Sequence, residues 1–363
     1  MIGRPFVIAW KELRQVRRDR LTLAMMLVLP ILQLLLFGYA INQDVRHIHT
    51  VVYDEDRSAA SRDIVRRLEA TGFYDVVGHV RSYDEIDRAF KRGDARVAVV
   101  VPARFSSHLT RRDGGALVQL VVDGSDPQVV ASATDTASSL VAANVTTPGA
   151  AIRLEPNIRY NPELRTAINV VPGLVGVILT MTMVMLTAMA LARERERGTL
   201  EQLIVSPVKP IELVFGKIAP YVVIGYVQMT LILLAGYFVF RVPIRGSIPL
   251  LYLLSFLFIA ANLAIGLFFS TLAKTQQQAM QMSFFFLLPN ILLSGFVFPF
   301  EAMPAPARFL SQGLPLTHFL RIVRGVVLKG SGLGDLAGEL VWLAAILGAL
   351  VLLTSLRFRK KLV

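Results

Sequence analysis

Six long apolar stretches constrain this chain more than any other feature of its sequence. Each holds about 20 predominantly apolar residues with no charge in its central part, the length that an α-helix needs to cross a membrane. Hydrophobic residues make up 54% of the 363 residues and charged residues only 18%, below the roughly 25% of soluble domains. The sequence therefore predicts an all-α polytopic membrane protein. The predicted spans are Leu21–Ile41, Ile168–Ala192, Ala219–Phe240, Ile248–Ala273, Ala279–Phe298 and Leu336–Leu356.

The first span has an alternative interpretation as a cleaved signal peptide, because Gly38-Tyr39-Ala40 resembles a small-residue cleavage site. Signal peptides have apolar regions of about 7–15 residues. This one is longer and follows a 20-residue N-terminal segment, so we favour an uncleaved anchor. For the second span, Val171-Pro172-Gly173 is the expected entry point of the helix.

The net charge of +12 is concentrated beside the apolar stretches. Basic residues gather in residues 1–20 and in the C-terminal tail 357–363, whereas residues 42–167 hold 16 basic and 17 acidic residues. Positive flanks are typical of the cytoplasmic side of a membrane. We therefore expect both termini in the cytoplasm, residues 42–167 outside it, and no binding of nucleic acid. The chain has no cysteine, which excludes disulfides and thiolate metal sites.

Residues 42–167 have the pattern of an inserted α/β domain. Short apolar runs alternate with helical patterns, which favours a mixed or parallel sheet covered by helices. Expected strands are Thr50–Tyr53, Arg96–Val101 and Ala116–Val122, and expected helices are Ser61–Thr71, Asp84–Arg92 and Gln128–Asn144. The carboxylates of Asp54, Glu55 and Asp56 could form a cation site, but we favour a solvated turn after a strand.

Two shorter segments lie beside the spans. Residues 1–20 contain an amphipathic pattern with Trp10, Lys11, Glu12 and Arg14, typical of a helix in the headgroup layer; the alternative is a simple basic flank. Residues 299–331 are apolar but broken by four prolines. They are too interrupted for one span and too apolar for a solvated loop, so we expect a re-entrant pair of short helices shielded by protein.

The sequence offers no energy source of its own. Gly325 and Gly330 have the spacing of a phosphate-binding loop, but Ser331 and Gly332 follow where Lys and Ser or Thr are needed. The spans carry no central charge that could relay protons or sodium ions. We expect no catalytic residue, no metal and no cofactor on this chain, and an energy supply from a partner.

The connection 193–218, expected to be cytoplasmic, is the most informative segment. It reads RERERGTLEQLIVSPVKPIELVFGKI. Gly198 interrupts the preceding helix, Thr199 can cap a new one, and Pro207 ends it. Leu200, Leu203 and Ile204 give this short helix an apolar face. That face could contact a cytoplasmic partner or pack within an ordinary loop, and the residues alone leave both interpretations open.

This segment resembles the signature of the ABC type-2 permease family, and shorter motifs extend the resemblance over nearly the whole chain. Those motifs are Val52-Tyr53-Asp54-Glu55-Asp56, the turn Val122-Asp123-Gly124-Ser125, and Tyr160-Asn161-Pro162-Glu163 before Pro172-Gly173. They are similar to the branch with a large periplasmic domain that is associated with multidrug export. The signature positions here are Glu194, Glu196, Gly198, Thr199, Leu200, Glu201, Leu203, Pro207 and Gly216-Lys217.

The resemblance implies a permease in a bacterial inner membrane, paired with a second copy or a paralogue. It implies that the short helix, with Ile204 on its apolar face, couples to separate ATPase subunits, which bind ATP and Mg²⁺. A periplasmic membrane-fusion protein is a further expected partner. Two alternatives stay open: export of lipids or polysaccharides instead of drugs, and a membrane-anchored sensor or scaffold with a ligand-binding outer domain.

Polar residues within the spans have two interpretations. The residues are Gln33, Gln228, Asn262, Gln281 and Asn290. They could line a transport pathway, but buried amides in membranes usually form hydrogen bonds between helices, and we favour that role. Met181, Met185 and Met189 recur at every fourth position of the second span. Methionine surfaces can bind varied apolar ligands; packing or lipid contact is the interpretation that we favour.

Overall fold

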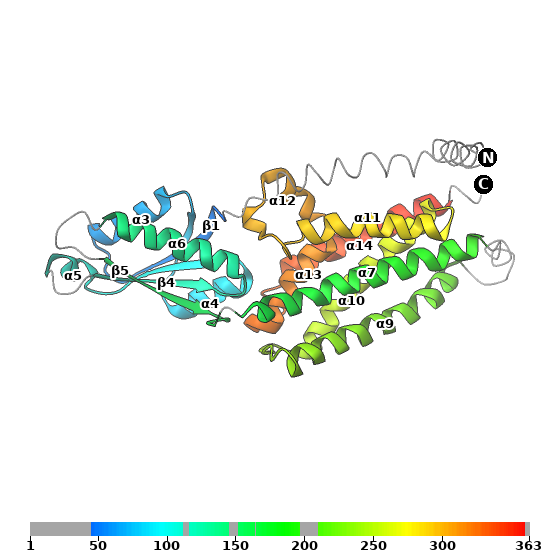
Figure 1. Ribbon diagram of the computed structural model, residues 1–363, viewed down its shortest axis with the longest axis horizontal. Helices are drawn as coiled ribbons and strands as arrows, with labels where there is room; N and C mark the ends of the chain where they lie inside the picture. Colours follow the sequence, from blue (N-terminus) through cyan, green and yellow to red (C-terminus); the bar gives the residue numbers. More distant parts are fainter. Residues whose placement is uncertain (1–44, 112–115, 145–151, 164, 197–209, 360–363) are drawn as a thin grey trace, which may run out of the picture.

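The protein consists of a sheet domain and a bundle of helices that lie end to end (Figure 1). The computed structural model describes residues 45–111, 116–144, 152–163, 165–196 and 210–359. The sheet domain comprises the described residues up to 163, and the helical bundle begins at residue 166. The predicted combination of membrane helices with an α/β sheet domain is confirmed.

The sheet domain is built on five strands in the order β2-β1-β3-β4-β5. All neighbouring strands are parallel except β3 and β4, which are antiparallel, so the sheet is mixed. The three predicted strands and three predicted helices are present, with each end within two residues of its predicted position. The strands are β1 Ile48–Asp54, β2 Tyr74–His79, β3 Val97–Val101, β4 Ala116–Asp123 and β5 Ile152–Arg159.

Helices cover both faces of this sheet. Successive side chains of β3 point to opposite faces, and all of them are apolar, so each face has to be covered. Val97, Val99 and Val101 pack with residues of α3, α5 and α6, while Ala98 and Val100 pack with Ile86 and Phe90 of α4. The four helices are α3 Ala59–Ala70, α4 Tyr83–Arg92, α5 Phe105–Arg111 and α6 Pro127–Asn144.

The acidic turn after β1 is held by local hydrogen bonds. The Asp54 carboxylate accepts from the amides of Asp56 and Arg57 and from the Ser61 hydroxyl. The Asp56 carboxylate accepts from Ser106. Within the described residues no group of His, Asp and Glu could hold a metal ion. These contacts agree with the turn that the sequence favoured over a cation site.

Four described helices contain segments long and apolar enough to cross a membrane. The helices are α7 Thr166–Glu196, α9 Pro210–Phe238, α10 Ile248–Leu272 and α14 Ala337–Arg359. The helix at the predicted span Ala279–Phe298, α11 Gln276–Leu293, is not among these four and ends before Phe298. The predicted first span 21–41 lies outside the described residues, so the six-span topology stays a prediction. The prediction that Val171-Pro172-Gly173 opens the second span is wrong, because α7 begins at Thr166 and Pro172 lies inside it.

Close helix contacts in the bundle depend on small residues. α7 and α10 form its centre, with 56% and 61% of their candidate spans buried, against 17% for α9 and 11% for α14. A Cβ atom at Gly266 of α10 would lie 2.6 Å from the Val184 carbonyl oxygen of α7. Without a hydrophobic driving force between helices in lipid, such close packing is a main source of association.

Short helices fill the segment between α11 and α14, as predicted for residues 299–331. They are the 3-10 helix η1 Phe300–Ala302, α12 Ala305–Gln312, α13 Pro315–Arg324 and the π-helix η2 Gly325–Lys329. The segment lies where the bundle meets the sheet domain (Figure 1), and a proline at the start of α12 and of α13 fixes where each helix begins. Whether these helices re-enter a membrane is left as a prediction.

The topology predicts opposite accessibility for Ser139 and Gln277. Both are exposed, at α6 of the sheet domain and at the far end of α11. Each can be changed to cysteine in this cysteine-free chain and treated with a membrane-impermeant thiol reagent. In intact spheroplasts we expect labelling of Ser139→Cys alone, with Gln277→Cys labelled only after permeabilisation. The reverse pattern would contradict the predicted orientation.

Candidate functional site

Much of the predicted coupling site lies outside the described residues. Glu196 is described at the end of α7, while the side chain of Glu194 is not. The predicted coupling residues Gly198, Thr199, Leu200, Glu201, Leu203 and Ile204, the interfacial residues Trp10, Lys11, Glu12 and Arg14, and Gln33 all lie outside the described part of the chain. Their roles stay predictions.

Glu196 joins α7 to the start of α11. Its Oε1 accepts a hydrogen bond from the Gln276 amide at 2.8 Å, and its Oε2 accepts one from Gln276 Nε2 at 2.6 Å. Arg193 Nε donates to Gln276 Oε1 at 3.1 Å. Gln276 is the first residue of α11, where a carboxylate is also favoured by the helix dipole. The chain entering 197–209 is therefore tied to two helices, a contact that we call the Glu196–Gln276 clamp.

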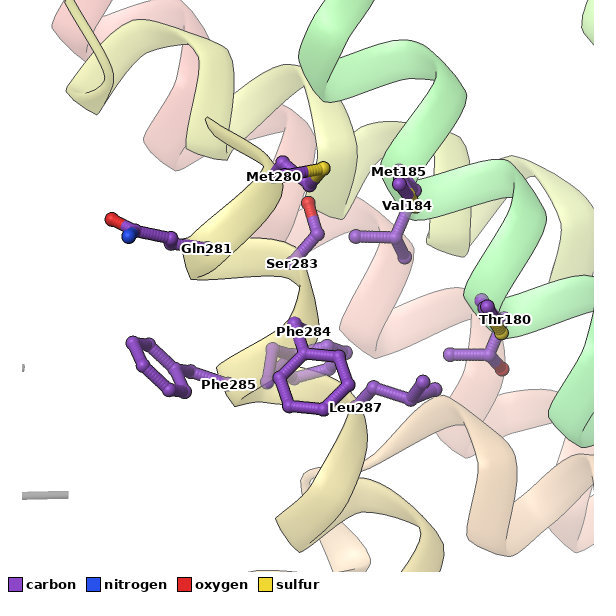
Figure 2. A pocket seen from close by; sticks show the side chains of 11 residues that line it. Thr180, Val184, Met185, Met280, Gln281, Ser283, Phe284, Phe285 and Leu287 are labelled. Carbon is purple, nitrogen blue, oxygen red and sulfur yellow. The ribbon is translucent and has the colours of Figure 1, made fainter. Parts of the chain in front are cut away.

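An apolar hollow lies between α7 and α11, further along the same two helices (Figure 2). Its volume is about 260 Å³, above the 150 Å³ that holds benzene in an engineered cavity and somewhat below typical ligand pockets. The residues lining it are Thr180, Met181, Val184, Met185, Met280, Gln281, Ser283, Phe284, Phe285, Phe286 and Leu287. Met181 and Met185 of the predicted methionine stripe thus line the hollow.

The hollow offers few polar groups and, among the described residues that line it, no charge. The Thr180 hydroxyl is buried and has no hydrogen-bond partner within the described chain. Ser283 donates to the Ala279 carbonyl of its own helix at 2.8 Å. A buried hydroxyl without a partner costs free energy, and this one is too deeply buried for a molecule in the hollow to contact it. The hollow therefore suits an uncharged apolar molecule.

Of the predicted polar residues within the spans, Gln281 of α11 lines this hollow, whereas Gln228, Asn262 and Asn290 do not. Gln228 of α9 accepts a hydrogen bond from Thr182 of α7 at 2.7 Å, a contact between helices. Asn262 of α10 donates to the Phe258 carbonyl within its own helix. Asn290 of α11 is fully buried, and neither its oxygen nor its nitrogen has a partner in the described chain.

The aromatic wall of the hollow and the clamp were both missed by sequence reasoning. The run Phe284-Phe285-Phe286 is the local signal that could have drawn attention to the hollow. Gln276 lies in a run of three glutamines and gave no reason to single it out. Its role appears only once α7 and α11 are seen to meet.

Comparison with known proteins gives a consistent result over nearly the full length. The family model for ABC-2 family transporter proteins matches residues 20–356. The chain is 30% identical over 361 residues to the probable multidrug ABC transporter permease YbhS of Escherichia coli (strain K12), covering 97% of this chain and 96% of YbhS. It is 31% identical over 349 residues to the probable multidrug ABC transporter permease YbhR of the same strain, covering 94% of each. It is 28% identical over 331 residues to the inner membrane transport permease YhhJ, also of that strain, covering 85% of this chain and 84% of YhhJ.

Removing the Glu196 carboxylate should loosen the start of α11. Glu196→Ala deletes the acceptor of the Gln276 amide, and a hydrogen bond to a charged group contributes about 1.5 kcal/mol, less where it is exposed. We expect hydrogen exchange at Gln276 to accelerate roughly five- to tenfold, measured by mass spectrometry on the purified chain. Gln277→Ala, at the exposed neighbouring position, is the matched control. Equal exchange in the two variants would show that the clamp does not hold the two helices together.

Proposed function

This chain belongs to the ABC-2 family of transporter proteins, and we propose that it exports uncharged apolar compounds outward across a bacterial inner membrane. As a permease of this family it is not itself catalytic, and ATP is bound by a partner ATPase subunit. The names of YbhS and YbhR support a drug-like cargo, and the name of YhhJ supports the inner membrane.

The hollow between α7 and α11 is the observation that carries this proposal. Aromatic and methionine side chains form most of its wall, and both adapt to apolar ligands of varied shape. Removing about 200 Å² of apolar ligand surface from water would contribute about 5 kcal/mol before entropic costs. Without charge or repeated polar groups in its described wall, the hollow selects for apolarity and not for a particular functional group.

The lining of the hollow also helps to distinguish a drug-like cargo from a polysaccharide or a lipid. A polysaccharide needs many hydrogen-bonding partners for its hydroxyl groups, and the described lining supplies few. A lipid acyl chain is apolar and would also fit this lining. A competition experiment, in which a lipid or a ring compound displaces a bound dye, is therefore needed to distinguish the two kinds of cargo. Family membership favours transport over a sensor or scaffold. We therefore propose a drug-like cargo, with a lipid as the competitor to test.

The clamp suggests how ATP hydrolysis would reach the hollow. α7 and α11 both line the hollow, and Glu196 and Gln276 join them at the end where the predicted coupling helix begins. An ATPase that pushes on residues 199–204 would therefore move both walls together. The N-terminal helix with Trp10, Lys11, Glu12 and Arg14 would provide a second contact at the same membrane surface.

We propose further partners outside these contacts. A second copy or paralogue would pair with this chain and complete the pathway on the open side of the hollow. The sheet domain, placed in the periplasm by the proposed topology, would be available to a membrane-fusion protein. Both termini would lie in the cytoplasm with the ATPase.

Filling the hollow should abolish binding of an apolar dye. Ser283 is buried in its wall, so Ser283→Trp places a large ring in the space. We expect the purified chain to bind the uncharged dye phenylnaphthylamine at least tenfold more weakly after this change, measured by fluorescence titration. Leu253→Trp, on the exposed face of α10, is the control and should bind like the wild type. Competition by a phospholipid but not by ring compounds would instead favour a lipid cargo, and unchanged binding in Ser283→Trp would remove the hollow from the pathway.

Removing the apolar face of the coupling helix should uncouple the complex. Truncating two interface leucines removes roughly 1–3 kcal/mol each, so Leu200→Ala with Leu203→Ala should abolish transport and dye-stimulated ATP hydrolysis in the reconstituted complex. Membrane insertion should persist, since the segment is expected outside the bilayer. Leu231→Ala with Leu234→Ala, two exposed leucines of α9, is the matched control. Normal coupling in the first variant would mean that this segment does not contact the ATPase.

A further inference from the structure

Lys329 is a buried cation at the end of the helical bundle that meets the sheet domain. It is the last residue of the π-helix η2, and Gly330 follows in a left-handed conformation with φ of 68°. Only 7% of Lys329 is exposed. π-helical turns are rare and frequently lie at functional sites, and a fully buried lysine needs a partner for its charge. The residue therefore calls for an explanation beyond packing.

Every described partner of the Lys329 ammonium belongs to the sheet domain. It forms a short ion pair with the Asp123 carboxylate at the end of β4, and it donates to the Phe90 carbonyl of α4 at 2.9 Å. The ring of Tyr160, just after β5, lies 6.0 Å away. One side chain of the bundle thus contacts three separate elements of the sheet domain.

The ion pair continues into a chain of alternating charges. Asp123 also accepts from Arg96 Nη1 at 2.9 Å, and Arg96 Nε donates to Glu301 of η1 at 3.2 Å. Asp123 and Arg96 belong to the sheet domain, while Lys329 and Glu301 belong to the segment between α11 and α14. The chain therefore crosses the boundary twice, and its two cations balance its two anions.

Each charged group in this network stabilises the charge of its neighbours. Burial alone would raise the pKa of Asp123, but Lys329 and Arg96 outweigh it and lower the pKa to about 2. Burial lowers the pKa of Lys329 to about 8, against the opposing effect of Asp123. Removing one partner of a buried pair leaves an uncompensated charge and is strongly unfavourable. The two domains are thus held where these charges meet.

Other contacts also join the domains at this boundary, among them Ala302 of η1, which belongs to the buried apolar cluster of the sheet domain. Ser331 donates to the Lys91 carbonyl at 3.0 Å, and Arg92 lies 3.6 Å from Asp335 with 57% of its side chain exposed. Exposed ion pairs contribute little. η2 is itself anchored to the bundle, since the Arg245 amide donates to the Val327 carbonyl at 2.9 Å. Among the described residues of η2, the side chain of Lys329 forms hydrogen bonds to the sheet domain, so movement of η2 would act on the sheet domain through it.

We propose that Lys329 is a positioning residue, whose ion pair with Asp123 holds the sheet domain in one orientation on the bundle and passes the movement of α13 and η2 to it during transport. The part of the proposal that concerns transport rests on the proposed function, whereas the part that concerns orientation does not. Separate readouts can therefore test the two parts.

Orientation is tested by electron spin resonance distances on the full chain. Spin labels at Asp84→Cys of α4 and Val341→Cys of α14, both exposed positions, report the distance between the sheet domain and the bundle. Unlabelled chain is added in excess to suppress signals between copies. We expect the distance distribution to become at least about twofold broader in Lys329→Met and unchanged in Arg92→Met, the exposed control. Asp123→Asn with Lys329→Met removes both charges, keeps the charge balance, and should broaden the distribution even if Lys329→Met alone does not fold. A wild-type distribution in the double variant would overturn the proposal.

Coupling is tested in the complex with its ATPase, reconstituted in vesicles and supplied with phenylnaphthylamine. In Lys329→Met, or in the double variant, we expect ATP hydrolysis to persist while dye moved per ATP falls at least fivefold. A merely structural role would lower both activities together, and that result would overturn the positioning role. If the wild-type complex moves no dye, the proposed function fails, and the distance measurements still decide the role of Lys329.

Discussion

The carboxylate of Asp123 lies fully buried between two cations, and this contact joins the sheet domain to the helical bundle. The turn that follows it is closely packed: the Gly124 amide donates to the Arg159 carbonyl at 2.9 Å, and a Cβ atom at Gly124 would lie 2.6 Å from the same oxygen. Only glycine fits there. The turn of residues 122–125, recognised in the sequence as a family motif, thus positions the anion at the boundary between the domains.

Elements with a strong local pattern could be predicted, and elements that depend on tertiary contacts could not. β3 and β4 are continuous apolar runs and were predicted nearly to the residue. β2 and β5 lie at the two edges of the sheet, where charges and Pro156 are tolerated, so their sequences lack a strand pattern. The start of α7 was placed too late, because Pro172 resembles a helix start even though the helix continues through it.

In the candidate site, too, features with a local sequence pattern could be predicted and features that depend on tertiary contacts could not. The coupling segment has its own sequence signature and was singled out, although most of it lies outside the described residues. The Lys329 ion pair joins residues 206 positions apart, so no local pattern announces it. Gly325 and Gly330 have the spacing of a phosphate loop, but Gly325 begins η2 and packs beside Leu336, and Gly330 caps the end of η2. The hollow depends on the approach of α7 to α11, and composition could indicate only that apolar rings were available.

Separation along the chain also has a consequence for biosynthesis. Translation adds about 5–20 residues per second, so roughly 10 to 40 seconds pass between Asp123 and its partner 206 residues later. After residue 163 has been added, the sheet domain presents Asp123 and Arg96 until Glu301 and then Lys329 are synthesised. Docking is therefore among the last steps of assembly, and a prematurely terminated chain keeps an open charged surface.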